Sequence, residues 1–277
     1  MPLQIRPMSE ADLATAIGWA AAEGWNPGLA DAGPFRAEDG QGFLMGWLGD
    51  QPVASISVIR YGGGFGFLGF YICVPEHRGQ GHGIALWRAG MARLEGRVVG
   101  LDGVVDQQAN YAKSGFVLAH RNIRYGGAVE VEAPDDPRLR APASPTALIG
   151  FDRAVFPAPR ARFLAAWLSA PGHVVRALVE DGAVTGYGVL RPCREGAKIG
   201  PLFAASEADA DLLFRALVAE APPGPVFLDP PEPNVAALRL AGRHGLSPVF
   251  ETARMYRGPA PELPLHRIFG ITSFELG

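Results

Sequence analysis

The glycine-rich stretch at residues 78–83 is the part of the sequence whose residue types and spacing best suit the binding of a ligand. It reads Arg-Gly-Gln-Gly-His-Gly, follows an apolar run that ends at Val74, and leads directly into a segment with apolar residues three and four positions apart. Glycine lets the backbone approach a ligand closely, and the free N–H groups at a helix N-terminus bind anions. The pattern therefore predicts a strand, a loop and a helix that together hold a phosphate or pyrophosphate.

Two common phosphate-binding motifs fit this loop poorly. A P-loop needs a lysine directly after its last glycine, and the chain has only Lys113 and Lys198, both distant. A dinucleotide-binding fingerprint follows the first strand of its unit with the spacing G-x-G-x-x-G, whereas here the glycines alternate and several predicted strands come first. Such a turn can also form for packing alone, but the arginine at its entrance favours an anion.

The loop resembles the acyl-CoA pyrophosphate loop, R/Q-x-x-G-x-G/A, of the GNAT N-acetyltransferase superfamily. That family also has an aromatic residue four positions before a Gly-Phe pair, as Tyr111 is here before Gly115 and Phe116. The resemblance implies acetyl-CoA or another acyl-CoA as co-substrate, without a metal. The cofactor-binding residues that it implies are Ile72, Cys73, Val74, Arg78, Gly79, Gln80, Gly81, His82, Gly83, Ile84 and Asn110.

The resemblance also implies direct attack of an amine on the acyl-CoA thioester. An alkyl amine has a pKa near ~10 and is mostly protonated at neutral pH, so the reaction needs a base or a chain of waters. Tyr111 stands at the family's proton-donor position, although packing beneath the cofactor is an alternative role. The strand before the loop carries no carboxylate, which leaves Glu23, Asp31, Asp106 or a water relay as the base.

The segment at residues 23–28 lies where the family has a loop that walls the acceptor site. Its sequence is Glu-Gly-Trp-Asn-Pro-Gly. The acceptor-binding residues predicted from this likeness are Glu23, Trp25, Asn26 and Asp31. A purely structural turn is the competing interpretation.

The chain repeats itself. Residues 50–60 resemble residues 181–191 at an offset of 131, and K-S-G-F at 113–116 matches R-H-G-L at 243–246 at an offset of 130. Three matches in order at a nearly constant offset, including an arginine nine residues after each glycine, indicate a duplication.

The repeat divides the chain into two similar domains. We place them at residues 1–132 and 146–277, the second ending in a tail, with a linker at 133–145 that contains four prolines and no periodicity. Arg124 and Arg254 occupy matching positions in strand-like runs of the two domains.

Each copy is predicted as a mixed α/β (α+β) sheet, with hairpin strands followed by strand–helix–strand–helix. In the first copy, a helix begins at Ser9 and another after the loop, with a buried stripe of Ile84, Trp87, Met91 and Leu94. The remaining elements predicted there are strands near Leu3 and at 43–48, 53–61, 66–74 and 98–105, a helix at 107–114 and two final strands. Those of the second copy are a helix around 163–168, strands at 173–179, 184–191, 197–203 and 225–229, and helices from Ser206 and at 234–243.

The second copy departs from the family pattern. Residues 199–206, at the loop position, lack R-x-x-G-x-G, and Pro201 removes an N–H group. Ala241 stands where the first copy has its tyrosine. We predict that this degenerate domain does not bind CoA in the usual way and that it is a candidate for the far wall of the acceptor site. Residues 23–28, 198–203 and 269–277 resemble the YitH-like tandem GNAT subfamily.

The composition excludes several other classes. With 48% apolar residues, the chain can form a core. A net charge of −3 disfavours a nucleic-acid binder. Cys73 and Cys193 are too few for a disulfide framework or a zinc site, which favours a reducing, cytoplasmic location. No apolar run approaches the roughly 18 residues of a membrane span, and the N-terminus lacks the apolar region of a signal peptide.

These observations predict an acyl-CoA-dependent N-acyltransferase, most simply one that acetylates the primary amine of a small molecule in a ternary complex. The alternative is a non-catalytic acyl-CoA-binding sensor or scaffold, which the missing strand carboxylate favours, whereas the intact loop and Tyr111 favour the enzyme. Acetylation of a protein would be the same reaction on a larger acceptor. The predicted partner is therefore a small molecule rather than nucleic acid or membrane, and the sequence does not indicate an oligomeric state.

Overall fold

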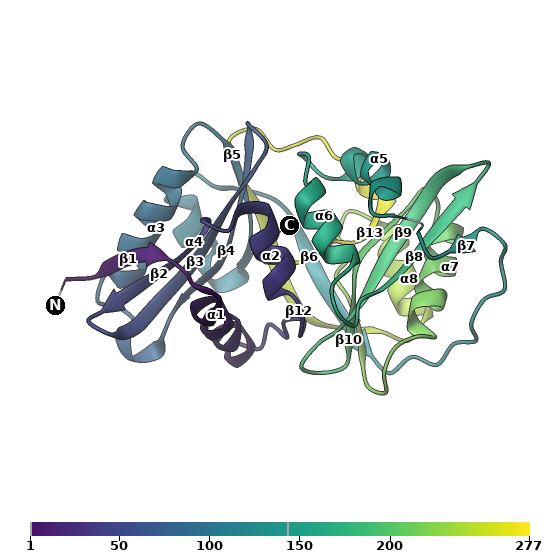
Figure 1. Ribbon diagram of the computed structural model, residues 1–277, viewed down its shortest axis with the longest axis horizontal. Coiled ribbons are helices and arrows are strands. Elements are labelled where there is room, and N and C mark those ends of the chain that lie inside the picture. Colours follow the sequence, from purple (N-terminus) through teal and green to yellow (C-terminus); the bar gives the residue numbers. More distant parts are fainter. Residues whose placement is uncertain (1, 143) are drawn as a thin grey trace.

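The computed structural model describes residues 2–142 and 144–277. Its strands form one 13-stranded mixed sheet with helices packed on it (Figure 1). One apolar cluster includes side chains of α1, α2, α5 and α6 and spans both halves of the chain, while α3 and α4 cover the first half and α7 and α8 the second. The predicted mixed α/β class is confirmed.

The first half forms the predicted elements in order as far as Gly127, with one helix, at Ala32–Asp39, that the sequence pattern did not predict. Ser9 caps α1 reciprocally with Asp12, as the sequence indicates for a helix start. The elements are β1 (Gln4–Pro7), α1 (Glu10–Ala22), α2 (Ala32–Asp39), β2 (Phe43–Leu48), β3 (Gln51–Tyr61), β4 (Phe65–Cys73), α3 (His82–Arg93), β5 (Val98–Val104), α4 (Gln108–Ala112) and β6 (Val117–Gly127).

The second half follows the same order. Ser206 begins α7, where its hydroxyl accepts from the N–H of Asp209. The elements are β7 (Leu139–Arg140), α5 (Thr146–Val155), α6 (Ala161–Leu168), β8 (Val174–Glu180), β9 (Ala183–Pro192), β10 (Ala197–Ala204), α7 (Glu207–Val218), β11 (Val226–Leu228), α8 (Val235–Arg243), β12 (Ser247–Arg257) and β13 (Ile268–Gly270).

The two halves exchange strands. The sheet order is β1-β2-β3-β4-β5-β12-β6-β11-β10-β9-β8-β7, so β12 of the second half lies between β5 and β6 of the first. In turn, β6 lies between β12 and β11. The prediction of two final strands within the first half is therefore wrong: β6 is one of them, and the place beside it belongs to β12. Local pattern predicts a strand but not its partner.

Two buried ion pairs cross between the halves at matching positions. Arg254 of β12 donates to both carboxylate oxygens of Asp102 on β5, at 2.8 and 2.6 Å. Arg124 of β6 donates to both oxygens of Asp229, next to β11, at 2.8 Å each. These are the two arginines that the repeat aligns. Each exchanged strand is thus held by a bidentate pair to the half that receives it.

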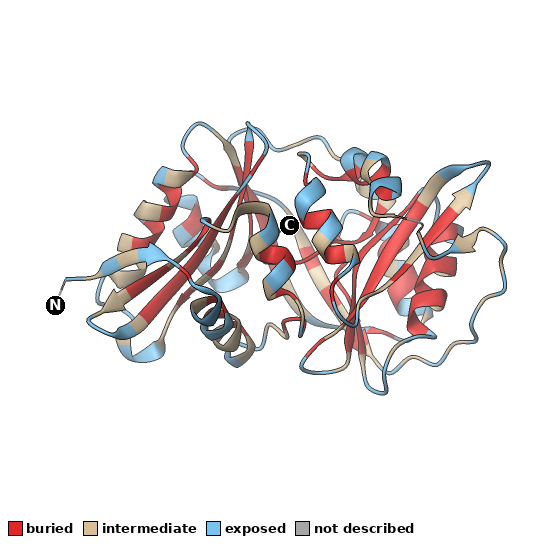
Figure 2. Cartoon of the chain, in the orientation of Figure 1, coloured by how far each residue is buried: buried red, intermediate tan, exposed pale blue. Residues whose placement is uncertain are grey.

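Residues 268–277 run between the two halves and are all buried (Figure 2). β13 pairs with β10, and the N–H of Ile271 then donates to the carbonyl of Asp229 at 3.0 Å. Near the end of the segment, the hydroxyl of Tyr61 donates to the carbonyl of Leu276 at 3.0 Å. This tail therefore contacts elements of both halves.

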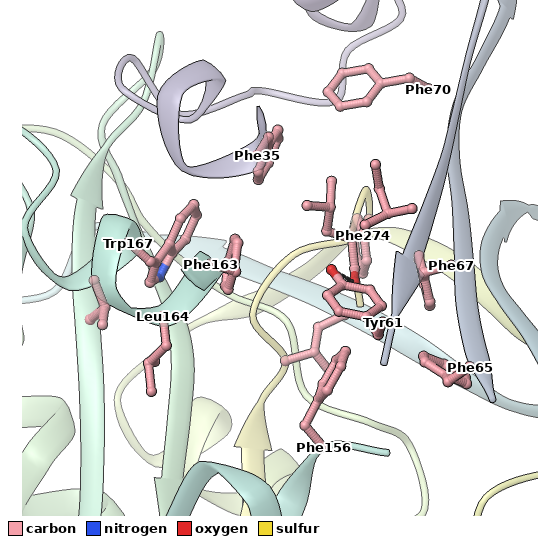
Figure 3. Packing of buried hydrophobic residues seen from close by; sticks show 14 of the residues in the cluster. Phe35, Tyr61, Phe65, Phe67, Phe70, Phe156, Phe163, Leu164, Trp167 and Phe274 are labelled. Atoms are coloured by element: carbon pink, nitrogen blue, oxygen red, sulfur yellow. Dashed lines mark hydrogen bonds between the residues drawn. The ribbon is translucent and has the colours of Figure 1, made fainter. Parts of the chain in front are cut away.

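Aromatic rings fill the junction around the tail (Figure 3). Phe35 of α2 stacks on Trp167 of α6 with ring centres 5.9 Å apart and nearly parallel planes. Tyr61 packs edge-on against Phe156 at 5.0 Å. Both contacts join residues from different halves, so the junction is a shared core with the packing of a domain interior.

One residue of the predicted buried stripe is exposed. Trp87, Met91 and Leu94 are buried as predicted, but Ile84 is 46% exposed. Ile84 lies in the first turn of α3, beyond the strands that the helix covers, and faces the cavity described below. In the described part of the chain, no helix is both long and apolar enough to cross a membrane.

Candidate active site

β4 and β5 pair only over their first halves. The parallel ladder runs from Phe65 opposite Val98 to Leu68 opposite Leu101 and then stops. Beyond it, a bulge interrupts the pairing of β4 with β3, and its residue Phe70 has a φ of +46°. The two strands therefore diverge and leave a wedge with unpaired backbone groups on their facing edges.

A cavity of about 590 Å³ occupies this wedge. The diverging strands, the loop before α3, residues of β12 and the tail all line it. The lining residues are Glu23, Trp25, Leu68, Gly69, Phe70, Tyr71, Ile72, Cys73, His77, Arg78, Gly79, Gly81, Gly83, Ile84, Leu101, Asp102, Gly103, Val104, Gln107, Tyr111, Phe250, Thr252, Phe274 and Glu275.

The glycine-rich loop opens onto this cavity. Gly79 and Gly81 have φ values of +75° and +86°, which glycine adopts without strain, and no atom lies within 4 Å of where a Cβ would stand on either. Gly81 is the N-cap of α3, and the first bond of the helix runs from the N–H of Ala85 to the Gly81 carbonyl. The earlier N–H groups have no partner within the helix, which suits an anion.

Arg78 is held by the protein itself. Its Nε donates to the carbonyl of Cys73 at 2.8 Å, and its Nη2 donates to Glu23 at 2.5 Å. The guanidinium therefore ties the loop to the end of β4 and to the segment after α1. Half of the side chain is exposed, which leaves the remaining N–H groups accessible to a ligand.

Most of the predicted cofactor residues line the cavity: Ile72, Cys73, Arg78, Gly79, Gly81, Gly83 and Ile84. Four lie outside its lining. The N–H of Val74 already donates to Val53, and the Gln80 amide donates to the Glu76 carbonyl. The short turn before α4 contributes Gln107 to the lining in place of Asn110, whose side chain bonds Gln107 and Lys113. His82 is the fourth predicted residue outside the lining.

Two tyrosines line the cavity, and both pack against Trp87. Tyr111 stacks on the indole at 5.6 Å, and Tyr71 meets it edge-on at 5.1 Å. Burial raises the pKa of Tyr71 to about 12 and raises that of Tyr111 well above its ordinary value. Both hydroxyls therefore stay protonated at neutral pH and can donate. Sequence analysis found Tyr111 through its motif but missed Tyr71, which only its place on β4 brings to the site.

Three carboxylates line the cavity, and only one of them was predicted. Glu23 does so, but it accepts from Arg78. Asp102 also lines it, and its oxygens accept from Arg254 and from the amide of Asn122. Burial raises the pKa of Asp102, against the lowering effect of the Arg254 charge. The third, Glu275, comes from the tail.

The other two predicted base candidates lie elsewhere. Asp31 is buried in an ion pair with Arg191 at 2.5 Å and accepts from the N–H of Gly28 at 2.9 Å. Asp106 is exposed and is not among the lining residues. Asp31 thus joins the segment before α2 to β9 of the second half.

The predicted acceptor segment is divided between two roles. Trp25 lines the cavity, and its carbonyl accepts from Arg124 at 2.8 Å. Asn26 instead bonds the second half: its amide donates to the carbonyl of Glu195 and accepts from the N–H of Glu195 at 2.9 and 3.0 Å, and its carbonyl accepts from Lys198. Burial lowers the pKa of Lys198 to about 8. Asn26 and Asp31 therefore hold the halves together.

Sequence analysis missed every cavity residue supplied by the second half: Phe250, Thr252, Phe274 and Glu275. Phe250 and Thr252 belong to no motif, and the resemblance of residues 269–277 assigns no role to Phe274 or Glu275, because all four enter the cavity through strand exchange and through the tail. Their presence agrees with the expectation that the second half contributes a wall.

Two other kinds of catalytic site, a metal centre and a cysteine nucleophile, find little support in the described residues. Within residues 2–142 and 144–277, no group of three His, Cys, Asp or Glu side chains is placed to hold a metal ion. Both cysteines are free thiols, and burial raises the pKa of the Cys73 thiol, which makes it a poor nucleophile.

Comparison with known proteins connects this geometry to one family. Residues 10–116 match the family model described as "Acetyltransferase (GNAT) family", and residues 148–270 match the model "Acetyltransferase (GNAT) domain". Holothin acyltransferase of Pseudoalteromonas sp. (strain SANK 73390) is 34% identical over 275 residues, which cover 98% of this chain and 94% of that protein.

Solved structures share the fold. A protein of Pyrococcus horikoshii assigned to the acetyltransferases superposes with a TM-score of 0.82 at 23% identity, over 99% of this chain and 96% of that one. A tandem GNAT protein from the clavulanic acid biosynthesis pathway superposes with a TM-score of 0.62 at 16% identity, over 94% of this chain and 100% of that one.

Proposed function

Given that this chain belongs to the GNAT acetyltransferase family and is an acyltransferase with two such domains in tandem, we propose that it transfers an acyl group from acyl-CoA, acetyl-CoA first, to the primary amine of a small molecule. The observation that carries the proposal is the wedge between β4 and β5, which leads without interruption to the open N-terminus of α3.

The residues of this wedge fit an acyl-CoA. The free edge of β4 at Ile72 and Cys73 would pair with the pantetheine amides as an added strand does. The N–H groups of residues 79–84 would hold the pyrophosphate. The thioester would then lie near Tyr111, which is buried and protonated.

The reaction is a direct displacement in a ternary complex. As the amine nitrogen bonds to the acyl carbon, the carbon–sulfur bond breaks and the thiolate of CoA takes a proton from the hydroxyl of Tyr111. A thiolate with a pKa of about 8–9 is a better leaving group when a donor protonates it. The amine must also lose a proton, and the carboxylates that line the cavity are the candidate proton acceptors.

The name of the curated relative suggests an acceptor to try. Holothin acyltransferase is named for holothin, so holothin is the first acceptor to test here. We also propose a cytoplasmic location, the YitH-like tandem subfamily, and domain limits at residues 132 and 146.

Release of free thiol from acetyl-CoA, with the N-acyl product detected by mass spectrometry, tests the function. We expect turnover with holothin or with one member of a panel of small primary amines. Comparison of acyl-CoAs of increasing chain length then identifies the preferred acyl donor. The sensor alternative predicts that acetyl-CoA binds in calorimetry but that no thiol is released with any amine. That outcome would replace the enzyme by the sensor.

A further inference from the structure

The tail brings Glu275 to the point where β4 and β5 diverge. It passes so close to β4 that a Cβ on Gly69 would lie 2.2 Å from the carbonyl oxygen of Glu275. A tight turn fixes the segment: the N–H of Leu276 donates to the hydroxyl of Ser273 at 3.1 Å, and the N–H of Gly277 to the Ser273 carbonyl at 3.0 Å. The backbone at Glu275 is therefore well defined beside the wedge.

Glu275 differs from the other carboxylates of the cavity. Glu23 is paired with Arg78, and Asp102 with Arg254 and Asn122. Glu275 is only 3% exposed, and its Oε1 is buried without a hydrogen-bond partner in the described protein. Among these three acids, it is the one with a fully buried carboxylate oxygen that lacks a hydrogen-bond partner in the described residues.

A second polar group of the same cavity shares this property. The Oγ1 of Thr252, on β12, is also buried without a hydrogen-bond partner among the described residues. A buried polar atom without a partner costs of order 1–3 kcal/mol, and a buried charge costs more. The charges of Arg124 and Arg191 act on Glu275 and offset part of the cost of its charge, but no described residue donates a hydrogen bond to its Oε1. An ammonium group of a ligand supplies such a donor.

We propose that Glu275 is the catalytic residue that receives the acceptor amine: its carboxylate binds the ammonium form and takes its proton. This inference rests on the proposed acyl transfer. The neutral amine then attacks the thioester carbon, the carbon–sulfur bond breaks, and Tyr111 protonates the departing thiolate. The proton on Glu275 leaves to solvent, and Tyr111 regains a proton from the second N–H that the nitrogen loses as the amide forms, so the sum is ammonium plus acyl-CoA giving amide, free thiol and one proton.

The walls around Glu275 define the body of the acceptor. Trp25, Phe250 and Phe274 line the same cavity and come from three separate segments of the chain. Aromatic walls favour a flat or apolar body by burial and ring packing. The site therefore fits a primary amine carried on a compact aromatic or apolar group, with the amine directed at Glu275.

The test compares E275Q with the wild type on two kinds of amine. Phenethylamine has a pKa near ~10 and must lose a proton, whereas aniline is already neutral at pH 7.5. We expect kcat/KM of E275Q to fall about 10²-fold with an alkyl amine but less than threefold with an aromatic amine, because only the former needs a base. E275D should recover part of the lost rate.

E251Q is the matched control, since Glu251 lies on β12 beside Thr252 but bonds Arg121 at the surface. It should keep wild-type kinetics, and acetyl-CoA should bind E275Q as it binds the wild type. An E275Q enzyme with wild-type kcat/KM on alkyl amines, or an equal loss on both kinds of amine, overturns the role of Glu275 while the proposed function stands. A wild type that acylates no amine overturns both.

Discussion

The two wedges of this sheet have opposite contents. Between β4 and β5 the strands diverge around an open cavity, whereas in the second half β10 pairs with β11 only over Ala197–Ile199 and then with β13 of the tail. The backbone edge that would accept pantetheine is thus free in one half and occupied by the chain's own strand in the other. One copy can hold a ligand, and the other holds the tail.

Two equivalent glycines show how the tail uses both wedges. A Cβ on Gly200 would lie 2.5 Å from the carbonyl of Thr272, and one on Gly69 would lie 2.2 Å from that of Glu275. These glycines are 131 residues apart, which is the offset of the repeat. The segment anchored in the closed wedge therefore continues into the open one. The second half therefore positions part of the cavity that opens in the first half.

The largest effect should come from separating the halves. A fragment ending at residue 135 lacks β12, which lies between β5 and β6, so both strands would lose their partner and expose apolar faces. We expect the fragment not to fold cooperatively in circular dichroism melts, and co-expression with residues 144–277 to restore a soluble complex. A monomeric, cooperatively folded fragment that binds acetyl-CoA would refute the exchange as a folding requirement.

Breaking one crossing ion pair should cost about 3–5 kcal/mol of unfolding free energy, because it leaves a buried carboxylate unpaired. Arg254→Met leaves Asp102 without its arginine, and Arg124→Met does the same to Asp229. The two variants should therefore lose similar unfolding free energies in urea titrations. Arg121→Met is the control: its partners are partly exposed, and it should cost less than ~1 kcal/mol. Losses as small as that of the control at either buried site would contradict equivalent roles.

Gly81→Val should weaken acetyl-CoA binding about 10²-fold, or roughly 2.7 kcal/mol, because it strains the φ of +86° and fills the open side of the loop. Gly245→Val is matched, with a φ of +74° and equally open space but no contact with the cavity, and it should bind normally. Calorimetry of the wild type should give one acetyl-CoA per chain. A second molecule that persists in Gly81→Val would mean that the second wedge also opens.

Removal of a single hydroxyl should affect catalysis alone. Tyr111→Phe should lower kcat by about 10²-fold with little change in acetyl-CoA affinity, and Tyr71→Phe should lower it by less than tenfold. Because burial raises the pKa of Tyr111, its hydroxyl stays protonated as pH rises, so any alkaline loss of rate that it causes lies above pH ~10. Full-speed turnover by Tyr111→Phe would leave packing on Trp87 as the role of the ring.

Local features could be predicted where neighbours in sequence decide them. The cap at Ser9, the glycine-rich loop at 78–83 and the helix after it follow from residue types over a few positions. The exposure of Ile84 could not be predicted, because periodicity locates a face but not where its cover ends. Asn26 and Asp31 have residue types suited to a site, yet their partners are on the other half.

By itself the sequence determined the duplication, the glycine-rich loop at 78–83 and the place of Tyr111 before Gly115 and Phe116, because each can be recognised from a short pattern of residues. Only the tertiary structure decided that β12 completes the first half, that β13 closes the second wedge, and that Glu275 reaches the first. Those contacts join residues at least 65 positions apart in the sequence. Their free energy comes from burial and pairing across the fold, which no local pattern contains.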